Sequence, residues 1–221
     1  MIRLSGITKQ FSDGEERVNK VLRGVDLHVE RGEMVAIKGP SGSGKSTLLN
    51  ILGTQLYPDK GRYLFDEKEI DIPGVDYSRF RNQSIGFVFQ DHRLLPQLPI
   101  LQNILLPTLA FSDRSTDEEV IRAHSLLQRV GLAVDSSRMP STLSGGESQR
   151  VALCRALIMK PKAVLADEPT GQLDRENALI IARLLHQMSK EEHVAIVMVS
   201  HSDEVSSVAD RIYNLADGVL K

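Results

Sequence analysis

The sequence contains a single cysteine, Cys154, among its 221 residues. A disulfide within the chain is therefore excluded, and the cysteine usage favours a reducing compartment. Cys154 lies in an apolar segment of helical spacing, residues 151–157. We therefore expect a small packed side chain at this position rather than a reactive thiol.

The sequence also lacks an uninterrupted apolar run long enough to cross a membrane. Its longest apolar-rich stretch, residues 94–111, is broken by three prolines and several polar residues, which excludes a membrane span there. The first six residues do not have the layout of a secretory signal peptide. We therefore expect any work at a membrane to depend on a partner protein.

Neither sign of charge is in large excess. The chain has 27 Lys and Arg against 29 Asp and Glu, a net charge of −2. No basic block stands out, so the composition gives no indication of nucleic-acid binding, and we expect none. With 41% hydrophobic and 25% charged residues, the chain has room for a substantial core in one large domain, with or without a small subdomain.

What the sequence does contain is a glycine-rich loop of the form G-x-x-x-x-G-K-S, which begins at Gly39. It lies between an apolar, strand-like run at residues 34–37 and a helical segment at residues 47–52. Glycines let successive backbone N–H groups turn toward an anion, and the helix N-terminus adds its positive dipole end. We therefore predict a phosphate-binding loop rather than an ordinary Gly/Ser-rich turn, with Lys45 on the β- and γ-phosphates and Ser46 on Mg²⁺. The residues of this loop are Gly39, Pro40, Ser41, Gly42, Ser43, Gly44, Lys45, Ser46 and Thr47.

Three later apolar strands are followed by polar side chains. The strands and the residues at their ends are 84–89 with Gln90, 162–166 with Asp167 and Glu168, and 194–200 with His201. Ligands of parallel sheets bind at the C-terminal ends of strands. We therefore predict that these side chains lie with Lys45 at one edge of the sheet. Each residue alone is also consistent with a solvated strand end. Because neighbours in a strand face opposite sides, Asp167 and Glu168 have different roles. One approaches Mg²⁺ through water and the other approaches an attacking water.

The sequence LSGGE begins a second helix of chemical interest. Ser144 and Glu147 have the spacing of a capping box for a helix that runs through Met159. A serine, two glycines and a helix N-terminus also form an anion site, and a capped helix still presents free N–H groups. Both roles therefore stand together. Asp174 is predicted to cap the next helix, residues 175–189.

The N-terminal third offers fewer chemical cues. Residues 1–33 indicate strands and turns, with an exposed turn at residues 12–16, and residues 53–81 are rich in turn signals. Phe11 is the notable side chain here. Its position leaves open whether it stacks on adenine or is an ordinary hairpin or core aromatic.

The middle of the chain combines a proline-broken apolar segment with a predicted helix. Residues 94–110 form either a sticky interaction surface or a loop folded onto its own domain. Overlapping S/T-x-x-E capping boxes at residues 115–119 then open a helix that ends at Gly131. Its predicted apolar stripe consists of Val120, Ile121, Leu127 and Val130, with His124 on or beside it.

These motifs occur in the order and spacing typical of an ABC-type ATPase domain, which the chain resembles over essentially its whole length. They are the phosphate loop, Gln90, LSGGE with Gln149 and Arg150, residues 167–170, residues 171–174, and His201. LSGG distinguishes this family from other phosphate-loop NTPases. A narrower similarity, at residues such as 50–53, 85–90 and 103–107, is to the ATP-binding subunits of lipoprotein-release, macrolide-export and FtsX-type exporters.

The resemblance implies an α/β fold. Its parts are a P-loop NTPase core with a mostly parallel sheet, an N-terminal antiparallel β subdomain and a small helical subdomain that carries the LSGG signature. It implies one ABC-type ATP-binding domain over residues 1–221. Residues 1–90 and 160–221 would be mainly core and β subdomain, and residues 91–159 mainly helical subdomain.

The resemblance also implies an ATP hydrolase that closes as a head-to-tail dimer around two ATP molecules. Phe11 would stack on adenine, Gln90 would ligate Mg²⁺ and sense the γ-phosphate, Asp167 would support Mg²⁺ through water, Glu168 would polarise the attacking water, and His201 would contact the γ-phosphate. The residues Ser144, Gly145, Gly146 and Glu147 would close over the ATP of the partner copy, and Asp174 would communicate across the dimer. Phe11 where Tyr is common, Glu147 where Gln is common and Gln172 where Asn is common are departures that leave every catalytic position filled.

The implied partners are a second copy, or another ABC ATPase domain, and a separate transmembrane permease that contacts the region after Gln90. The chain would then lie in the cytoplasm, on the inner face of the cell membrane. One alternative is a regulatory ATP switch for a membrane partner without transport. Another is a soluble non-transport ATPase of DNA repair or chromosomes, which is disfavoured because only about fifty residues separate Gln90 from Leu143 and they contain no long heptad arm.

Overall fold

A computed structural model describes residues 1–12, 18–70, 74–132 and 135–221. Most of the predicted turn at residues 12–16 lies outside the described residues. The larger sheet has six strands in the order β10-β9-β3-β8-β7-β6. All its neighbouring strands are parallel except β10, which pairs with β9 in the antiparallel sense. The strands are β3 (Met34–Lys38), β6 (Ile85–Phe89), β7 (Ala163–Asp167), β8 (Ala195–Val199), β9 (Arg211–Ala216) and β10 (Val219–Leu220).

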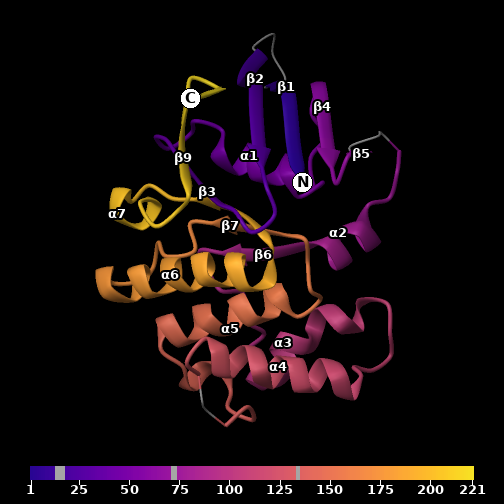
Figure 1. Ribbon diagram of the computed structural model, residues 1–221, viewed down its shortest axis with the longest axis vertical. Coiled ribbons are helices and arrows are strands. Elements are labelled where there is room, and N and C mark those ends of the chain that lie inside the picture. Colours follow the sequence, from indigo (N-terminus) through magenta and orange to yellow (C-terminus); the bar gives the residue numbers. More distant parts are fainter. Residues whose placement is uncertain (13–17, 71–73, 133–134) are drawn as a thin grey trace.

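A second, antiparallel sheet is formed by the N-terminal part of the chain and lies at the top of Figure 1. Its strands, in spatial order, are β2 (Val18–Val29), β1 (Ile2–Ser12), β4 (Lys60–Phe65) and β5 (Lys68–Ile70). The turn-rich interpretation of residues 53–81 was incomplete, because β4 and β5 lie within them and α2 (Ser78–Ser84) begins there. Tyr63 and Phe65 are buried, and β4 pairs with β1 on one side and with β5 on the other.

Helices α6, α5, α3 and α4 lie below the parallel sheet in Figure 1, with α5 between α6 and the pair α3 and α4, whereas α1 lies above β3, toward the antiparallel sheet. Their bounds are α1 (Lys45–Leu52), α3 (Ile100–Leu105), η1 (Leu106–Ala110), α4 (Asp117–Arg129), η2 (Pro140–Thr142), α5 (Gly145–Leu157), α6 (Arg175–Glu192) and α7 (Asp203–Ser206). The predicted α/β fold class is confirmed, with its mostly parallel core, antiparallel N-terminal sheet and separate group of helices. The division at residues 90 and 160 stays a prediction.

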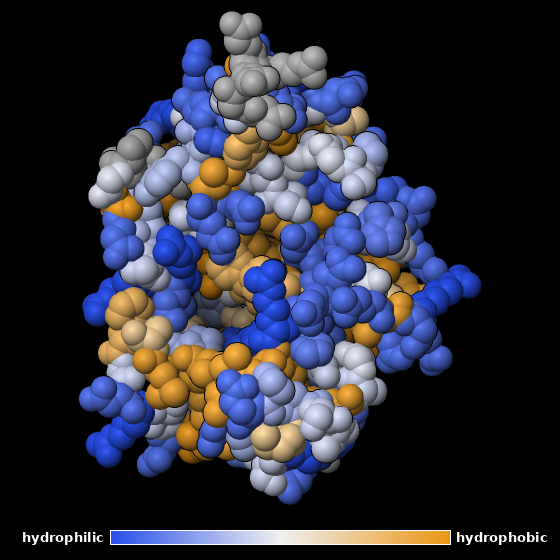
Figure 2. All heavy atoms as spheres, turned by 180° about the vertical axis from the view of Figure 1, so that it is seen from behind, coloured by the Kyte–Doolittle hydropathy of each residue, from blue (hydrophilic) through white to orange (hydrophobic). Residues whose placement is uncertain are grey.

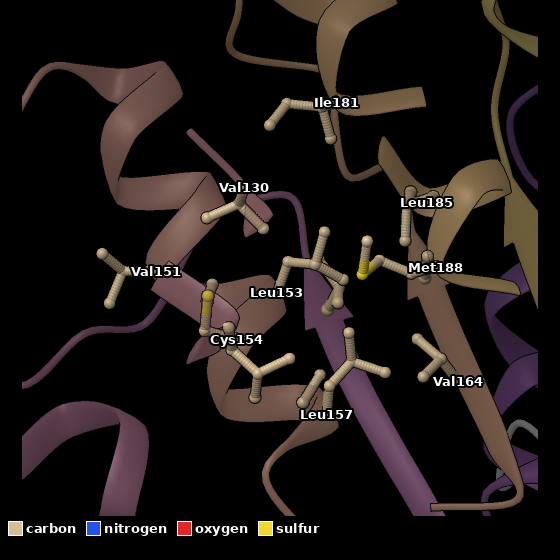
Figure 3. Packing of buried hydrophobic residues seen from close by; sticks show 14 of the residues in the cluster. Val130, Val151, Leu153, Cys154, Leu157, Val164, Ile181, Leu185 and Met188 are labelled. Atoms are coloured by element: carbon tan, nitrogen blue, oxygen red, sulfur yellow. The ribbon is translucent and has the colours of Figure 1, made fainter. Parts of the chain in front are cut away.

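The buried apolar residues of α5 belong to one hydrophobic cluster with residues of β7 and α6. Figure 3 shows Leu153 and Leu157 of α5 directed toward Met188 of α6 and Val164 of β7. Cys154 is fully buried in the same cluster, and burial raises the pKa of its thiol to about 12. The predicted role of a packed, unreactive side chain is consistent with this environment.

The predicted helix after residue 115 is present as α4, but its buried face differs from the prediction. Thr116 and Glu119 form the reciprocal capping box. Ile121 is 69% exposed, and the fully buried positions of the helix are Ala123 and Leu126 together with the predicted Leu127. The predicted stripe was therefore wrong at Ile121, which lies two residues before the buried Ala123 and so faces away from α5.

Residues 94–110 combine the two alternatives that the sequence left open. Their centre folds onto the domain, because the buried Asn103 accepts a hydrogen bond from the Leu95 amide and donates to the Leu95 and Leu98 carbonyls. Leu95 and Leu109 remain more than a third exposed. On the face shown in Figure 2, hydrophobic side chains gather at the height of α3–α5, below a hollow near mid-height. Over the described ranges, no helix combines the length and apolar character needed to cross a bilayer.

Candidate active site at the ends of the parallel strands

The phosphate loop follows β3 and wraps a cavity of about 410 Å³. Its tight path requires glycine. Gly44 has φ of +102°, and a Cβ there would lie 2.9 Å from Cγ1 of Val21. A Cβ on Gly39 would lie 2.2 Å from the Leu215 carbonyl oxygen. The loop therefore keeps its backbone close to the cavity, as a phosphate cradle requires.

Lys45 is buried at the base of this loop. Its ammonium donates to the carbonyl oxygens of Gly39 and Pro40, both at 2.8 Å. A lysine has three donors, so one remains for a phosphate oxygen after these two bonds. The hydroxyl of Ser43 is also buried and has no hydrogen-bond partner among the described residues. Both groups fit a bound anion.

Asp167, the last residue of β7, lies against the phosphate loop. The Ser46 hydroxyl donates to its carboxylate. Burial raises the pKa of Asp167, the charge of Glu168 raises it further, and Lys45 acts in the opposite direction. A hydroxyl and a carboxylate side by side are hard oxygen ligands of the kind that Mg²⁺ prefers. The residues present therefore fit this ion.

Glu168 has a backbone conformation that the sequence does not reveal. Its φ is +45°, in the left-handed region, and its N–H donates to the Val199 carbonyl of β8 at 3.0 Å. Its Oε2 lies 3.2 Å from Nδ1 of His201. Both side chains line the phosphate-loop cavity. Strain of this kind gathers at functional sites because the surrounding structure must hold it.

Gln90 follows β6, at the same edge of the sheet, but it does not line the cavity with Lys45. Its amide lies beside Gly171, where an added Cβ would be 2.9 Å from Nε2 of Gln90. Helix α5, which begins at the signature, holds the backbone just before Gln90 in place. The buried Gln149 of this helix donates to the Phe89 carbonyl at 2.8 Å. The sequence reasoning missed this contact, although Gln149 stands four residues before Leu153 and so shares its buried helix face.

The signature segment has the predicted capping box. The Ser144 hydroxyl accepts from the Glu147 amide at 3.2 Å, and the Glu147 carboxylate accepts from the Ser144 amide at 2.7 Å. Gly146 packs on the start of α6, where an added Cβ would lie 2.9 Å from Oδ1 of Asn177. Asp174 caps that helix by accepting from the Asn177 amide at 2.9 Å. The signature and the predicted communication residue are thus neighbours.

The structure divides the predicted site residues into two groups. One group lines the cavity and consists of Gly39, Ser41, Gly42, Gly44, Lys45, Ser46, Thr47, Glu168 and His201, with Asp167 hydrogen-bonded to Ser46. The other group does not line that cavity and consists of Phe11, Pro40, Ser43, Gln90, Ser144, Gly145, Gly146, Glu147 and Asp174. Phe11 is 42% exposed and has the Lys9 ammonium 5.7 Å from its ring centroid. Ser144 and Gly145 are exposed as well, so they are accessible to a second molecule.

Comparison with known proteins gives a consistent set of relatives. The family described as ABC transporter matches residues 22–171. The lipoprotein-releasing system ATP-binding protein LolD 1 of Rhodopirellula baltica is 43% identical over 221 residues, covering all of this chain and 96% of that protein. The macrolide export ATP-binding/permease protein MacB of the same organism is also 43% identical, but the chain spans only 32% of its length. The dimeric post-hydrolysis structure of the ATP-binding cassette MJ0796 with ADP and Pi is 36% identical, with a TM-score of 0.85 over all of this chain and 97% of that one.

Proposed function

The chain belongs to the ABC transporter family, and on that premise we propose that it hydrolyses ATP as a head-to-tail pair that drives a separate membrane subunit. The observation that carries the proposal is the division of the site. Lys45, Glu168 and His201 meet at one cavity, whereas the exposed signature at Ser144 lies outside it. Two copies arranged head to tail complete two sites at once.

Each side chain then has a chemical task. Lys45 and the loop amides hold the β- and γ-phosphates and stabilise the charge that develops in the transition state. Glu168 orients the water that attacks the γ-phosphorus and takes its proton. His201 holds the Glu168 carboxylate in place through Nδ1, and the rest of its ring would contact the γ-phosphate. The bond to the leaving β-phosphate oxygen breaks, and ADP and phosphate result.

Mg²⁺ would be held by Ser46, by Gln90 and, through water, by Asp167. The ion would neutralise charge on the β- and γ-phosphate oxygens. Asp167 must be ionised for this task. Its pKa is raised by burial and by Glu168, so the nearby ammonium of Lys45 contributes to keeping the carboxylate available.

The names of the relatives support export as the direction of transport. LolD and MacB carry names that refer to lipoprotein release and macrolide export. We therefore place the chain with exporter-type or mechanotransmission complexes, on the inner face of the cell membrane, with its permease docked after Gln90. A permease partner also accounts for a chain in whose described ranges no helix has the features of a membrane span.

A cross-linking experiment tests the shared site directly. Ser41 in the phosphate loop and Ser144 in the signature are both exposed, whereas Cys154 is buried and its thiol pKa is about 12. Single variants Ser41→Cys and Ser144→Cys, each in a Glu168→Gln background, are mixed and treated with a short thiol cross-linker. We expect a cross-linked dimer only in the mixture and only with ATP.

The controls separate this arrangement from other dimers. Ser125 is an exposed serine of α4 outside both motifs, and Ser125→Cys mixed with Ser41→Cys is expected to give no product. Cross-linking in a single variant, or in the mixture with ADP as efficiently as with ATP, would contradict the head-to-tail arrangement.

A further inference from the structure

A wide hollow lies on the antiparallel sheet, apart from the phosphate-loop cavity. It has a volume of about 590 Å³ and is bordered by β1, β2 and the start of β4, which lie side by side at the top of Figure 1. None of its lining residues lines the phosphate-loop cavity. Four cationic side chains line it against a single carboxylate, and we call it the basic hollow. Its lining consists of Thr8, Lys9, Gln10, Lys20, Leu22, Arg23, Asp59 and Lys60.

The carboxylate of the basic hollow, Asp59, is already satisfied by its neighbours. It accepts from the Lys9 ammonium at 2.8 Å and from the Gln10 amide at 2.7 Å. The hydrogen bond from Lys9 holds the pKa of the Asp59 carboxyl below its ordinary value. Asp59 is therefore ionised, and its charge is balanced by Lys9 alone.

The other three cations of the basic hollow are Lys20, Arg23 and Lys60, and all are exposed. Within the part of the chain that the structure describes, no ion pair joins any of them to an acidic side chain. The Arg23 guanidinium has a neutral partner, because its Nε donates to the Lys20 carbonyl at 3.4 Å. A carbonyl orients the guanidinium without cancelling its charge.

The strand register sets the spacing of these cations. Arg23 of β2 and Lys60 of β4 both pair with Thr8 of β1, one from each side. Neighbouring strands lie about 4.8 Å apart, so the backbones of Arg23 and Lys60 are about 10 Å apart with Thr8 between them. Lys20 pairs with Gln10, two residues farther along β1. The cations thus surround a hydroxyl and an amide, which are neutral hydrogen-bonding groups.

This spacing selects among anionic ligands. Like charges gathered on one sheet repel each other, and a bound anion relieves that repulsion. A single carboxylate would neutralise only one of the three cations. A ligand with several phosphate groups suits all three, because each phosphate has several acceptor oxygens and its charge is repeated along the molecule. Arginine binds phosphate oxygens in pairs, and lysine binds them as a point charge.

We propose that the basic hollow is a second anion site of the molecule, which binds a ligand with several phosphate groups. Arg23 and Lys60 hold neighbouring phosphates across Thr8, and Lys20 holds the next phosphate near Gln10. A dissolved polyphosphate and a cluster of phospholipid headgroups present this same chemistry. The site is independent of the proposed head-to-tail arrangement and of any membrane subunit.

Strand β2 connects the basic hollow with the phosphate loop. Leu22 is buried and lines the hollow, and a Cβ added to Gly44 of the phosphate loop would lie 3.0 Å from Cδ2 of Leu22. Val21, the preceding residue, lines the phosphate-loop cavity. A ligand that draws Lys20 and Arg23 together therefore acts on the part of β2 that packs against the phosphate loop. Occupation of either site should alter the affinity of the other by the same factor.

Inorganic tripolyphosphate tests the site while ADP fills the phosphate loop. The full chain is saturated with ADP, and tripolyphosphate binding is measured by isothermal titration calorimetry. We expect one tripolyphosphate to bind per chain, with an affinity that falls as the NaCl concentration rises. Arg23→Gln and Lys60→Gln should each weaken binding about fivefold, the upper range for the loss of one exposed charge pair. The double variant should bind more weakly than either single variant.

The matched control is Lys68→Gln, because Lys68 is an exposed lysine of β5, in the same sheet but outside the lining of the hollow. It should bind tripolyphosphate as the wild type does, and equal urea midpoints would show that all variants are folded. Loss of all tripolyphosphate binding on saturation with ADP would show that the phosphate loop is the site, and would overturn the proposal. Unchanged binding by the double variant, or equal weakening by Lys68→Gln, would overturn it as well.

Vesicles distinguish the two sources of phosphate. The chain is floated with vesicles of phosphatidylcholine alone and with vesicles that also contain phosphatidylglycerol. Binding to the second kind that is lost in Arg23→Gln and displaced by tripolyphosphate would support lipid headgroups as the ligand. Tripolyphosphate binding without vesicle binding would support a dissolved ligand, and the absence of both would refute the site.

Discussion

Replacement of Glu168 by Gln isolates the proposed chemical step from binding. The carboxylate lines the phosphate-loop cavity, and its Oε2 lies 3.2 Å from Nδ1 of His201. Gln has almost the same shape and can still share a hydrogen bond with the imidazole. The backbone N–H keeps its bond to the Val199 carbonyl. The variant therefore removes the proton acceptor and leaves the surrounding geometry in place.

The expected loss follows from the role of a general base. Such a group contributes about 10²- to 10⁴-fold to the rate, which corresponds to about 3–5 kcal/mol of activation free energy. ATP affinity should change by less than about twofold, because Lys45, Ser46 and the loop amides are unaltered. Phosphate release at saturating ATP measures the first quantity, and equilibrium binding of ATP measures the second.

A nearby carboxylate provides the matched control. Glu204 lies in the neighbouring hollow with Glu168 but is held by Arg175 at 2.7 Å and does not line the phosphate-loop cavity. Glu204→Gln should hydrolyse ATP at close to the wild-type rate. A Glu168→Gln protein that loses binding as strongly as turnover, or that keeps most of its turnover, would refute the assignment.

Three further predictions concern the support of the site and the stability of the fold. Gln149→Leu should lower the maximal ATPase rate about tenfold with a smaller change in the KM for ATP, because the backbone before Gln90 loses the hydrogen bond that holds it. Steady-state kinetics at several Mg²⁺ concentrations measure both quantities. Burial alone would raise the pKa of Asp210, but hydrogen bonds that include one from Lys190 lower it to about 2. The stability that this carboxylate contributes is therefore present above about pH 4 and is lost as the pH falls toward 2. Asp210→Asn should lower the free energy of unfolding at pH 6 by about 1 kcal/mol after solvent screening. Urea titrations should show a smaller difference between variant and wild type at pH 3. Cys154 should resist maleimide in the folded protein and react once the chain is unfolded, as mass spectrometry would detect.

The features that the sequence predicted well depend on residues close together in the chain. The phosphate loop needs only the spacing of its glycines, Lys45 and Ser46, and the signature cap needs only Ser144 and Glu147, three residues apart. Four of the five parallel strands could be found because each is a short apolar run that ends in a polar residue; β9 was missed because it is largely exposed and lacks such a run. Their C-terminal ends then meet at one edge for a topological reason, since every strand of a parallel set points the same way.

The features that the sequence missed depend on distant partners. Strand β4 contains the turn-like Gly61 and becomes a strand because β1 supplies its hydrogen bonds. The left-handed conformation of Glu168 is fixed by the Val199 carbonyl, which comes from a strand more than thirty residues away. A hollow of about 540 Å³ beside β6 joins Arg81, Arg93 and Arg155 from three separate segments. No spacing rule brings such residues together before the fold is known.

Helix α5 gives a physical reason why these sites should act as one. Its 13 residues span about 20 Å. Ser144 caps its N-terminus, Gln149 donates to the carbonyl of Phe89, and Arg155 donates to the carbonyls of His92 and Arg93. A helix packed on both sides moves as a rigid element rather than bending at one residue. A membrane subunit that displaces the segment after Gln90 therefore shifts the signature with it, and closure of the signature over ATP shifts that segment by the same linkage. Coupling between ATP and the membrane subunit is then reciprocal, and each should tighten the binding of the other by the same factor.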